Sequence, residues 1–295
     1  MYFKNTTTLV MNSILMLCIG AYLSACNNNS NSPKNVDSTL AEIRNSDIKN
    51  GGDTTKKTIS NFQYDSTKKY VFLTFDDGPQ PGTMEVYHAI EETGVKATFF
   101  MVGLHETFAK SLTSVVDTIR SSYPNTLLAN HSYTHAFNDR YFNFYHHPYL
   151  ALNDFMKAEE SLKATHKIMR LPGNDAWVLD SSHITAAPLV KPLCKLFDST
   201  GAKVMGWDVE WHFKRNPHGS GQVPVQSAQA MANAIIYAME NNHGHRKNTV
   251  VMLSHDRLFH LPNYKDSLVT MIQILQKAHP EYVYETADHY PGFLK

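Results

Sequence analysis

The chain has 295 residues, of which 42% are hydrophobic and 18% are charged, so it can bury the core of one globular domain and still carry further segments. Its 27 basic and 27 acidic residues balance, and no basic stripe interrupts that balance. Because there is no electrostatic basis for binding nucleic acid, we expect no nucleic-acid partner.

The first segment, residues 1–26, has the pattern of an export signal. Lys4 is its only charged residue, residues 11–25 are mostly apolar, and it ends in Leu-Ser-Ala-Cys at Cys26. This ending resembles the lipobox of bacterial lipoproteins, although an ordinary signal peptide or a short membrane anchor is the alternative. The apolar run is short of the roughly 20 residues that a bilayer crossing needs. We therefore expect an exported protein that is lipid-anchored to the bacterial cell envelope through Cys26.

Residues 27–69 are rich in Asn, Ser, Lys, Asp and Thr and contain few large apolar side chains. Such a composition cannot bury enough surface to offset chain entropy. We therefore expect a flexible polar tether over 27–69, a folded domain over 70–290 and a short tail over 291–295.

From residue 70 onward, short apolar runs alternate with stretches of helical spacing. The runs predict strands at 70–75, 97–102, 126–130, 167–171, 203–209, 249–254 and 282–285. The stretches predict helices at 83–93, 105–122, 149–165, 183–199, 225–242 and 263–278. This alternation indicates a parallel α/β sheet covered by helices, which we expect to be a distorted or incomplete (β/α)7 barrel. An open doubly wound sheet is the alternative.

Two adjacent carboxylates, Asp76 and Asp77, follow the first predicted strand within TFDDGP. They are costly to place together unless a positive charge lies beside them. A divalent cation would provide it, with one Asp as ligand and the other as the base for a bound water. The alternative is a turn at Asp-Gly whose aspartates only cap the backbone.

Histidines follow two further strands. His131 and His135 lie in HSYTH, where an i, i+4 spacing would put both imidazoles on one helical face, suitable for a metal. His255 follows the sixth strand in LSH and can protonate a leaving amine, unless it is a satisfied core histidine. Arg170 lies beside the same strand ends in RLPG.

Taken in order, TFDDGP, ATFF, HSYTH, RLPG, WDVEW and LSH resemble the motifs of the polysaccharide deacetylases of the NodB-homology type (carbohydrate esterase family four), over roughly residues 68–290. The resemblance implies that Asp77, His131 and His135 hold the metal. It implies that Asp76 is the general base, oriented by Arg170.

The same resemblance implies that His255 is the general acid and that the backbone N–H of Gly173 helps to stabilise the oxyanion. The implied reaction is attack of metal-bound water on an acetamido carbonyl. Two departures stand out. The family often has an aromatic residue where this chain has Gly173, and the acidic partner of His255 is either Asp208 or Glu210, of which we favour Asp208.

Aromatic residues are dense over 137–149, directly after the metal histidines, and Trp207, Glu210 and Trp211 lie in WDVEW. We expect the first group, with Tyr141 and Tyr145, to form a sugar-stacking wall, or else a loop packed on the barrel. Trp207, Glu210 and Trp211 are further substrate-binding candidates.

The resemblance implies a hydrolase that removes N-acetyl groups from N-acetylhexosamine units of a cell-wall or surface polysaccharide, and we expect it to be a monomer. The implied cofactor is one divalent ion, preferably zinc, with cobalt, manganese or nickel as alternatives. The alternatives in function are an O-acetyl polysaccharide esterase with the same fold and a catalytically silent glycan-binding lipoprotein.

Overall fold

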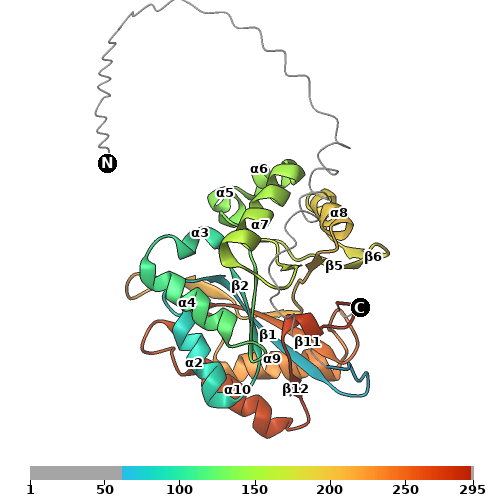
Figure 1. Ribbon diagram of the computed structural model, residues 1–295. Helices are drawn as coiled ribbons and strands as arrows, with labels where there is room; N and C mark the ends of the chain where they lie inside the picture. The colour runs from blue at the N-terminus through green and yellow to red at the C-terminus, as the bar shows by residue number, and fades with distance from the viewer. Residues whose placement is uncertain (1–61, 294–295) are drawn as a thin grey trace, which may run out of the picture. The chain divides into compact units, whose positions relative to one another are not determined.

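The structure is a computed structural model that describes residues 62–293 (Figure 1). The predicted signal segment, the lipidation residue Cys26 and most of the predicted tether lie outside the described residues. Residues 62–69, which the sequence analysis placed in the tether, are part of the folded body. Phe62 stacks on His289 with 4.0 Å between ring centroids, and Tyr64 lies 5.1 Å from Tyr70.

A ten-stranded sheet runs through the described body. Seven neighbouring strands pair in parallel. In order across the sheet they are β7 (Lys203–Val204), β4 (Ile168–Met169), β3 (Thr126–Asn130), β2 (Ala97–Met101), β1 (Tyr70–Gly78), β11 (Thr249–His255) and β8 (Val209–Glu210). Within residues 62–293 the strand order is a path with two ends, β6 and β8, so the barrel is incomplete, as the sequence predicted.

The helices form two groups along this sheet (Figure 1). Helices α2, α4, α9 and α10 group together beside β1, β2 and β11, while α5, α6, α7 and α8 gather toward the hairpin β5–β6. Their bounds are α2 (Thr83–Thr93), α3 (Gly103–Glu106), α4 (Lys110–Ser121), α5 (His135–Asp139), α6 (Tyr141–His146), α7 (Pro148–Leu162), α8 (Lys191–Ser199), α9 (Ala228–Glu240) and α10 (Ser267–Ala278), with short 3-10 turns η1 (Asp256–Phe259) and η2 (Ala287–His289). Among residues 62–293, none of these helices combines the length and apolarity that a bilayer crossing requires.

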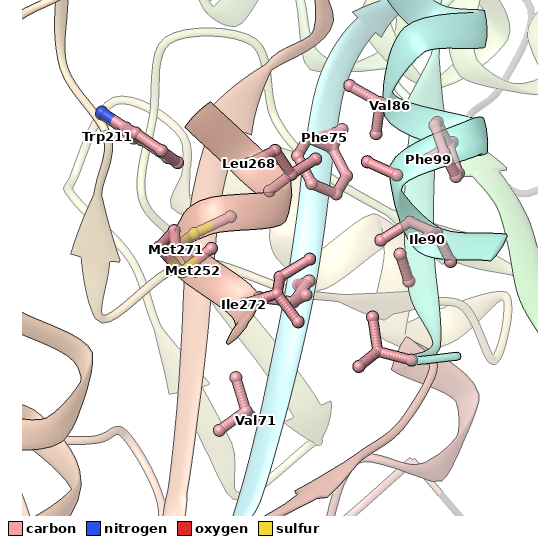
Figure 2. Packing of buried hydrophobic residues seen from close by; sticks show 14 of the residues in the cluster. Val71, Phe75, Val86, Ile90, Phe99, Trp211, Met252, Leu268, Met271 and Ile272 are labelled. Carbon is pink, nitrogen blue, oxygen red and sulfur yellow. The ribbon is translucent and has the colours of Figure 1, made fainter. Parts of the chain in front are cut away.

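Strand β1 is buried along its whole length, which explains why its residues from Tyr70 to Leu73 are all apolar. Val71 and Phe75 point into the core formed with α2, α9 and α10, whereas Tyr70 and Phe72 belong to the cluster on the other face. Figure 2 shows Phe75 among Val86, Phe99 and Leu268. Burying each such side chain stabilises the fold by about 1.5–3 kcal/mol, so β1 is a rigid support for the residues at its end.

Several short elements differ from the expectations. The predicted helix 183–199 begins only at Lys191, because His183–Thr185 form β6, which pairs antiparallel with β5 (Trp177–Asp180). A second hairpin joins β9 (Phe213–Arg215) to β10 (Gln222–Pro224). The last predicted strand is reduced to β12 (Val283–Tyr284), which pairs with the start of β1.

Candidate active site

The polar residues singled out in the sequence lie at the carboxyl ends of β1, β3, β4 and β11. Register places Asp76 opposite His255 on the neighbouring strand. Both aspartates are buried, with Asp76 3% exposed and Asp77 4% exposed. Since parallel strands bring their carboxyl ends to one edge of the sheet, four segments far apart in the chain build one site.

Asp77, His131 and His135 form a group that can hold a metal ion, with one ligand atom of each lying within 4.8 Å of the others. Asp77 Oδ1 is 3.1 Å from His135 Nε2 and 3.5 Å from His131 Nε2. This oxygen is buried and accepts no hydrogen bond of ordinary geometry. Burial would raise the pKa of Asp77, but the imidazoles of His131, His135 and His255 hold it well below its ordinary value, so the carboxyl is ionised.

The other nitrogen of each metal-facing imidazole is held by an acceptor. His131 Nδ1 lies 3.0 Å from the carbonyl oxygen of Arg170, and His135 Nδ1 lies 2.5 Å from Asp139 Oδ1. Because a carbonyl and a carboxylate only accept, each Nδ1 carries the proton and each Nε2 presents its lone pair. Two imidazole nitrogens and one carboxylate oxygen facing a common point fit a divalent cation with open positions.

His131 and His135 lie close together but not on one face of a helix. The expectation of a shared helical face is therefore wrong. Residues 131–134 are a loop, and Ser132 has a φ of 67°. The buried carboxylate of Asp154 on α7 holds this loop by accepting the N–H groups of Tyr133 and Thr134 and the hydroxyl of Thr134, at 2.8, 3.1 and 2.9 Å. The i, i+4 spacing correctly predicted that the two histidines lie close together, but a tight turn and not a helix brings them there.

Asp76 is fixed by the fully buried Arg170, as the sequence analysis expected. Arg170 Nη1 donates to Asp76 Oδ1 at 3.0 Å and to Thr74 Oγ1 at 2.6 Å. The rest of the guanidinium donates to the carbonyl oxygens of Met205 and Gly206 at 3.1 and 2.8 Å. These contacts leave Asp76 Oδ2 free of Arg170 and 3.7 Å from His131 Nε2, beside the candidate metal position.

His255 lies on the opposite side of Asp77, with its Nε2 4.0 Å from Asp77 Oδ2. Burial lowers the pKa of His255, against the opposing charges of Asp77 and Asp76. Its Nδ1 is buried, and no residue among 62–293 hydrogen-bonds to it. The edge of the ring meets Phe213 of β9 at 4.8 Å between centroids.

The expected pairing of Asp208 with His255 is therefore wrong. Asp208 accepts the backbone N–H groups of His245 and Val251 at 2.6 and 2.7 Å, and so ties the segment before β8 to β11. Glu210, the other candidate, lies 3.3 Å from His212 Nδ1 instead.

Two of the five substrate-binding candidates belong to the core, which corrects the sequence analysis. Trp211 is fully buried and donates through Nε1 to the carbonyl oxygen of Gln226 at 2.9 Å. Tyr145 is 1% exposed, and its hydroxyl donates to the carbonyl oxygen of Pro172 at 2.6 Å. Trp207 remains half-buried, 6.0 Å from the Arg170 guanidinium, and Tyr141 lies beside His135 with 6.0 Å between ring centroids.

The loop that follows Asp77 is anchored by Asp256, a residue that the sequence analysis did not single out. The hydroxyl of Thr83 donates to Asp256 Oδ2 at 2.5 Å, and a Cβ at Gly78 would lie 2.6 Å from the same oxygen. Burial raises the pKa of Asp256 to about 8. Gly78 is therefore required for the close approach of this carboxyl to the strand end.

Three further residues support the site and were also missed. Arg257 Nη2 donates to Asp77 Oδ2 at 2.6 Å, and Nδ1 of His105 lies 2.8 Å from the backbone oxygen of Asp77. Asp139 holds His135 as described above. A signal existed for two of them, since Arg257 follows His255 by two residues and Asp139 lies four residues after His135.

Comparisons with known proteins identify what the chain is similar to. A family model described as polysaccharide deacetylase matches residues 63–171, which contain both aspartates, both metal-facing histidines and Arg170. A bifunctional xylanase/deacetylase from Pseudobutyrivibrio xylanivorans is 41% identical over 68 residues, which are 23% of this chain and 11% of that protein. A peptidoglycan-N-acetylglucosamine deacetylase from Bacillus cereus is 26% identical over 192 residues, which are 64% of this chain and 60% of that protein.

Among solved structures, the family 4 carbohydrate esterase from Streptomyces lividans has a TM-score of 0.51 and 21% identity, over 76% of this chain and 95% of that one. That likeness shows the fold. Residues 63–171 thus match the polysaccharide deacetylase family model, and the fold matches that of a family 4 carbohydrate esterase.

Proposed function

We propose that this protein is a metal-dependent hydrolase that removes N-acetyl groups from N-acetylhexosamine units of a cell-wall or surface polysaccharide. The observation that carries the proposal is the convergence of Asp77, His131 and His135 within 4.8 Å, between a carboxylate held by an arginine and the half-buried His255. The Bacillus cereus relative is a peptidoglycan-N-acetylglucosamine deacetylase, which supports an amino-sugar polymer as the substrate class.

Two residues around the centre carry out the two proton transfers that the hydrolysis of an amide requires: Asp76 acts as the base and His255 as the acid. A divalent cation held by Asp77, His131 and His135 would polarise the acetamide carbonyl and lower the pKa of water. Asp76, with one oxygen occupied by Arg170, accepts the proton of the attacking water. His255 donates a proton to the nitrogen as the C–N bond breaks, so that acetate and a free amine leave. The backbone N–H of Gly173 is the proposed donor to the developing oxyanion.

We assign zinc as the cation. Two imidazoles and one carboxylate with open positions are a common catalytic zinc arrangement, and cobalt, manganese and nickel accept the same donors. Metal content after purification and exchange against each ion tests this assignment.

Release of acetate from N-acetylglucosamine oligomers tests the function. We expect turnover by the unmutated chain, loss with a chelator, recovery with zinc, and loss in His131→Ala. The matched control is His218→Ala, which removes an exposed histidine on the β9–β10 hairpin and should leave turnover unchanged. Activity confined to O-acetylated polymers would replace the proposal with the esterase alternative, and glycan binding without any acetate release would replace it with the silent binding protein.

We further propose that the protein is exported and held on the cell envelope by a lipid on Cys26. This proposal is supported by the apolar run over residues 11–25 and the small residues directly before the cysteine. Cys26→Ser should move the protein from the membrane fraction to the soluble one. Continued sedimentation with membranes would point to another anchor.

A further inference from the structure

The segment after the second metal-facing histidine has an unusual backbone. Five successive non-glycine residues, His135 to Asp139, have positive φ angles of 47°, 55°, 56°, 57° and 63°. Left-handed helical geometry costs L-residues roughly 1–2 kcal/mol each, so surrounding contacts must hold this turn in place. Thr134 supplies two of them, since its hydroxyl accepts the N–H of Phe137 and its carbonyl accepts the N–H of Asn138, both at 2.9 Å.

The turn brings a carboxylate onto His135. Asp139 Oδ1 lies 2.5 Å from His135 Nδ1, on the side of the ring away from the metal-facing Nε2. The side chain of Asp139 is 68% exposed, and an isolated surface pair of this kind is worth little. Here, however, the same oxygen also accepts the hydroxyl of Tyr141 at 3.0 Å. The carboxylate is therefore held between two donors.

Tyr141 is itself held against the loop after β4. A Cβ built on Gly173 would lie 3.0 Å from Cε1 of Tyr141 and 3.3 Å from Cδ1 and Cζ, so the tyrosine ring occupies the space that a side chain at position 173 would need. Gly173 also has a φ of 64°, which favours glycine. The edge of the tyrosine ring faces His135 with 81° between the ring planes.

We propose that Asp139, Tyr141 and Gly173 act as one positioning unit for the metal ligand His135. Asp139 fixes the tautomer and orientation of the imidazole, Tyr141 holds Asp139 in place, and the absence of a side chain at Gly173 makes room for the Tyr141 ring. This inference rests on the proposed metal site. Neither Asp139 nor Tyr141 is a metal ligand in this proposal. Both raise the metal affinity by holding the imidazole of His135 in place.

The test measures the affinity of the purified full chain for zinc alone, by competition with a chromophoric chelator and without substrate. Asp139→Ala should weaken zinc binding by about 10–100-fold, the usual cost of losing a carboxylate behind a metal-bound histidine. Asp139→Asn, whose amide oxygen still accepts from Nδ1, should recover part of that loss. Gly173→Ala should also weaken zinc binding, because the new methyl group displaces Tyr141.

Tyr141→Phe should weaken zinc binding less than Asp139→Ala does. The double variant Asp139→Ala/Tyr141→Phe should be no worse than Asp139→Ala alone, because the tyrosine acts only through the aspartate. The matched control is Asp180→Ala, which removes the carboxylate of another exposed pair, 2.8 Å from His183 Nδ1 and outside the site. That variant should bind zinc as the unmutated chain does.

Three outcomes would overturn the proposal. Unchanged zinc affinity in Asp139→Ala would remove the positioning unit and leave the metal site standing. An equal loss in Asp180→Ala would show a general effect of surface charge. Failure of the unmutated chain to bind zinc or any of the alternative ions would overturn the metal site and this inference together. Circular dichroism of each variant keeps these outcomes separate from unfolding.

Discussion

Asp76 and Asp77 are adjacent in the chain, yet their surroundings separate their chemistry. Arg170 and Thr74 hold Asp76 from one side, whereas Asp77 presents Oδ1 to His131 and His135 and Oδ2 to Arg257. Each carboxylate thus has its own cationic partner, Arg170 for Asp76 and Arg257 for Asp77. The strand end supplies the positions, and the two arginines hold the carboxylates so that Asp77 Oδ1 faces His131 and His135.

This separation predicts different effects of the two amide substitutions. Asp76→Asn should lower turnover by about 10²–10⁴-fold, the range expected for losing a general base, while zinc content stays within a few-fold of the unmutated chain. The Asp77→Asn variant should lose both turnover and bound zinc. Acetate release and metal analysis after dialysis measure the two properties side by side. Loss of zinc in Asp76→Asn would show that the assignment within the pair is reversed.

A second residue-scale prediction concerns Trp211, which the structure moves from the substrate-binding candidates to the core. Its indole packs on Phe259 at 5.3 Å between ring centroids and is fully buried. Trp211→Ala should reduce the free energy of unfolding by about 3–5 kcal/mol in urea titrations, the usual cost of such a cavity. A raised KM with unchanged stability would instead restore a substrate-binding role. Trp207→Ala, at a half-buried position, is the comparison.

At the scale of single elements, periodicity predicts the structure where burial determines it. The helix expected over 83–93 is α2 at the same residues, and the strand expected over 126–130 is β3. The hairpins β5–β6 and β9–β10 were missed because strands of three or four residues with polar members show no alternation long enough to detect.

The turn α5 was missed for a different reason. Its left-handed backbone depends on contacts from outside the turn, and Asp154 on α7, nineteen residues beyond His135, anchors the preceding loop. The helical spacing therefore predicted that His131 and His135 lie close together, but it predicted the wrong backbone geometry between them. Local sequence carries the identity of the ligands, but the loop that orients them is fixed by tertiary contacts.

Asp154 accordingly offers a test at the element scale. Asp154→Ala leaves two backbone N–H groups of the histidine loop without their acceptor, which should cost about 1–3 kcal/mol of stability. Zinc affinity should fall as well, although Asp154 is no ligand. The neighbouring exposed Asn153→Ala on the same helix is the control and should change neither property. Loss of stability with full zinc affinity would mean that the loop keeps its geometry without this anchor.

At the scale of the whole molecule, the site is assembled from contacts across long sequence separations. Arg170 reaches Asp76 over 94 residues, and Arg257 reaches Asp77 over 180. The motif order made the first pairing predictable through family resemblance. No motif indicated the pairing of Arg257 with Asp77. The motifs also gave no sign that Asp208 would not reach His255. What the sequence could not provide is the register between strands, which decides which side chains share one edge of the sheet.

Another long-range ion pair lies at the opposite end of the sheet, and its contribution to the stability of the fold should depend on pH. Glu285, which follows β12, accepts both Lys96 Nζ at 2.8 Å and His289 Nδ1 at 2.6 Å. Burial raises the pKa of Glu285, but the hydrogen bonds from His289 and Lys96 outweigh it and leave the pKa below its ordinary value of 4.5. A depressed carboxyl pKa stabilises the fold fully above the unfolded-state value, and the contribution is lost as the pH falls through the folded-state value.

Glu285→Gln should therefore lower the free energy of unfolding by about 1–3 kcal/mol at pH 7, since a charged acceptor of two donors is lost. The difference from the unmutated chain should begin to shrink below about pH 4.5, where the unfolded carboxyl takes up its proton. Urea titrations at pH 7, 5 and 3.5 measure it. Glu281→Gln is the control, because Glu281 pairs with His279 at an exposed position. A difference that stays constant over this range would show that Glu285 stabilises the fold by packing alone, independently of its charge.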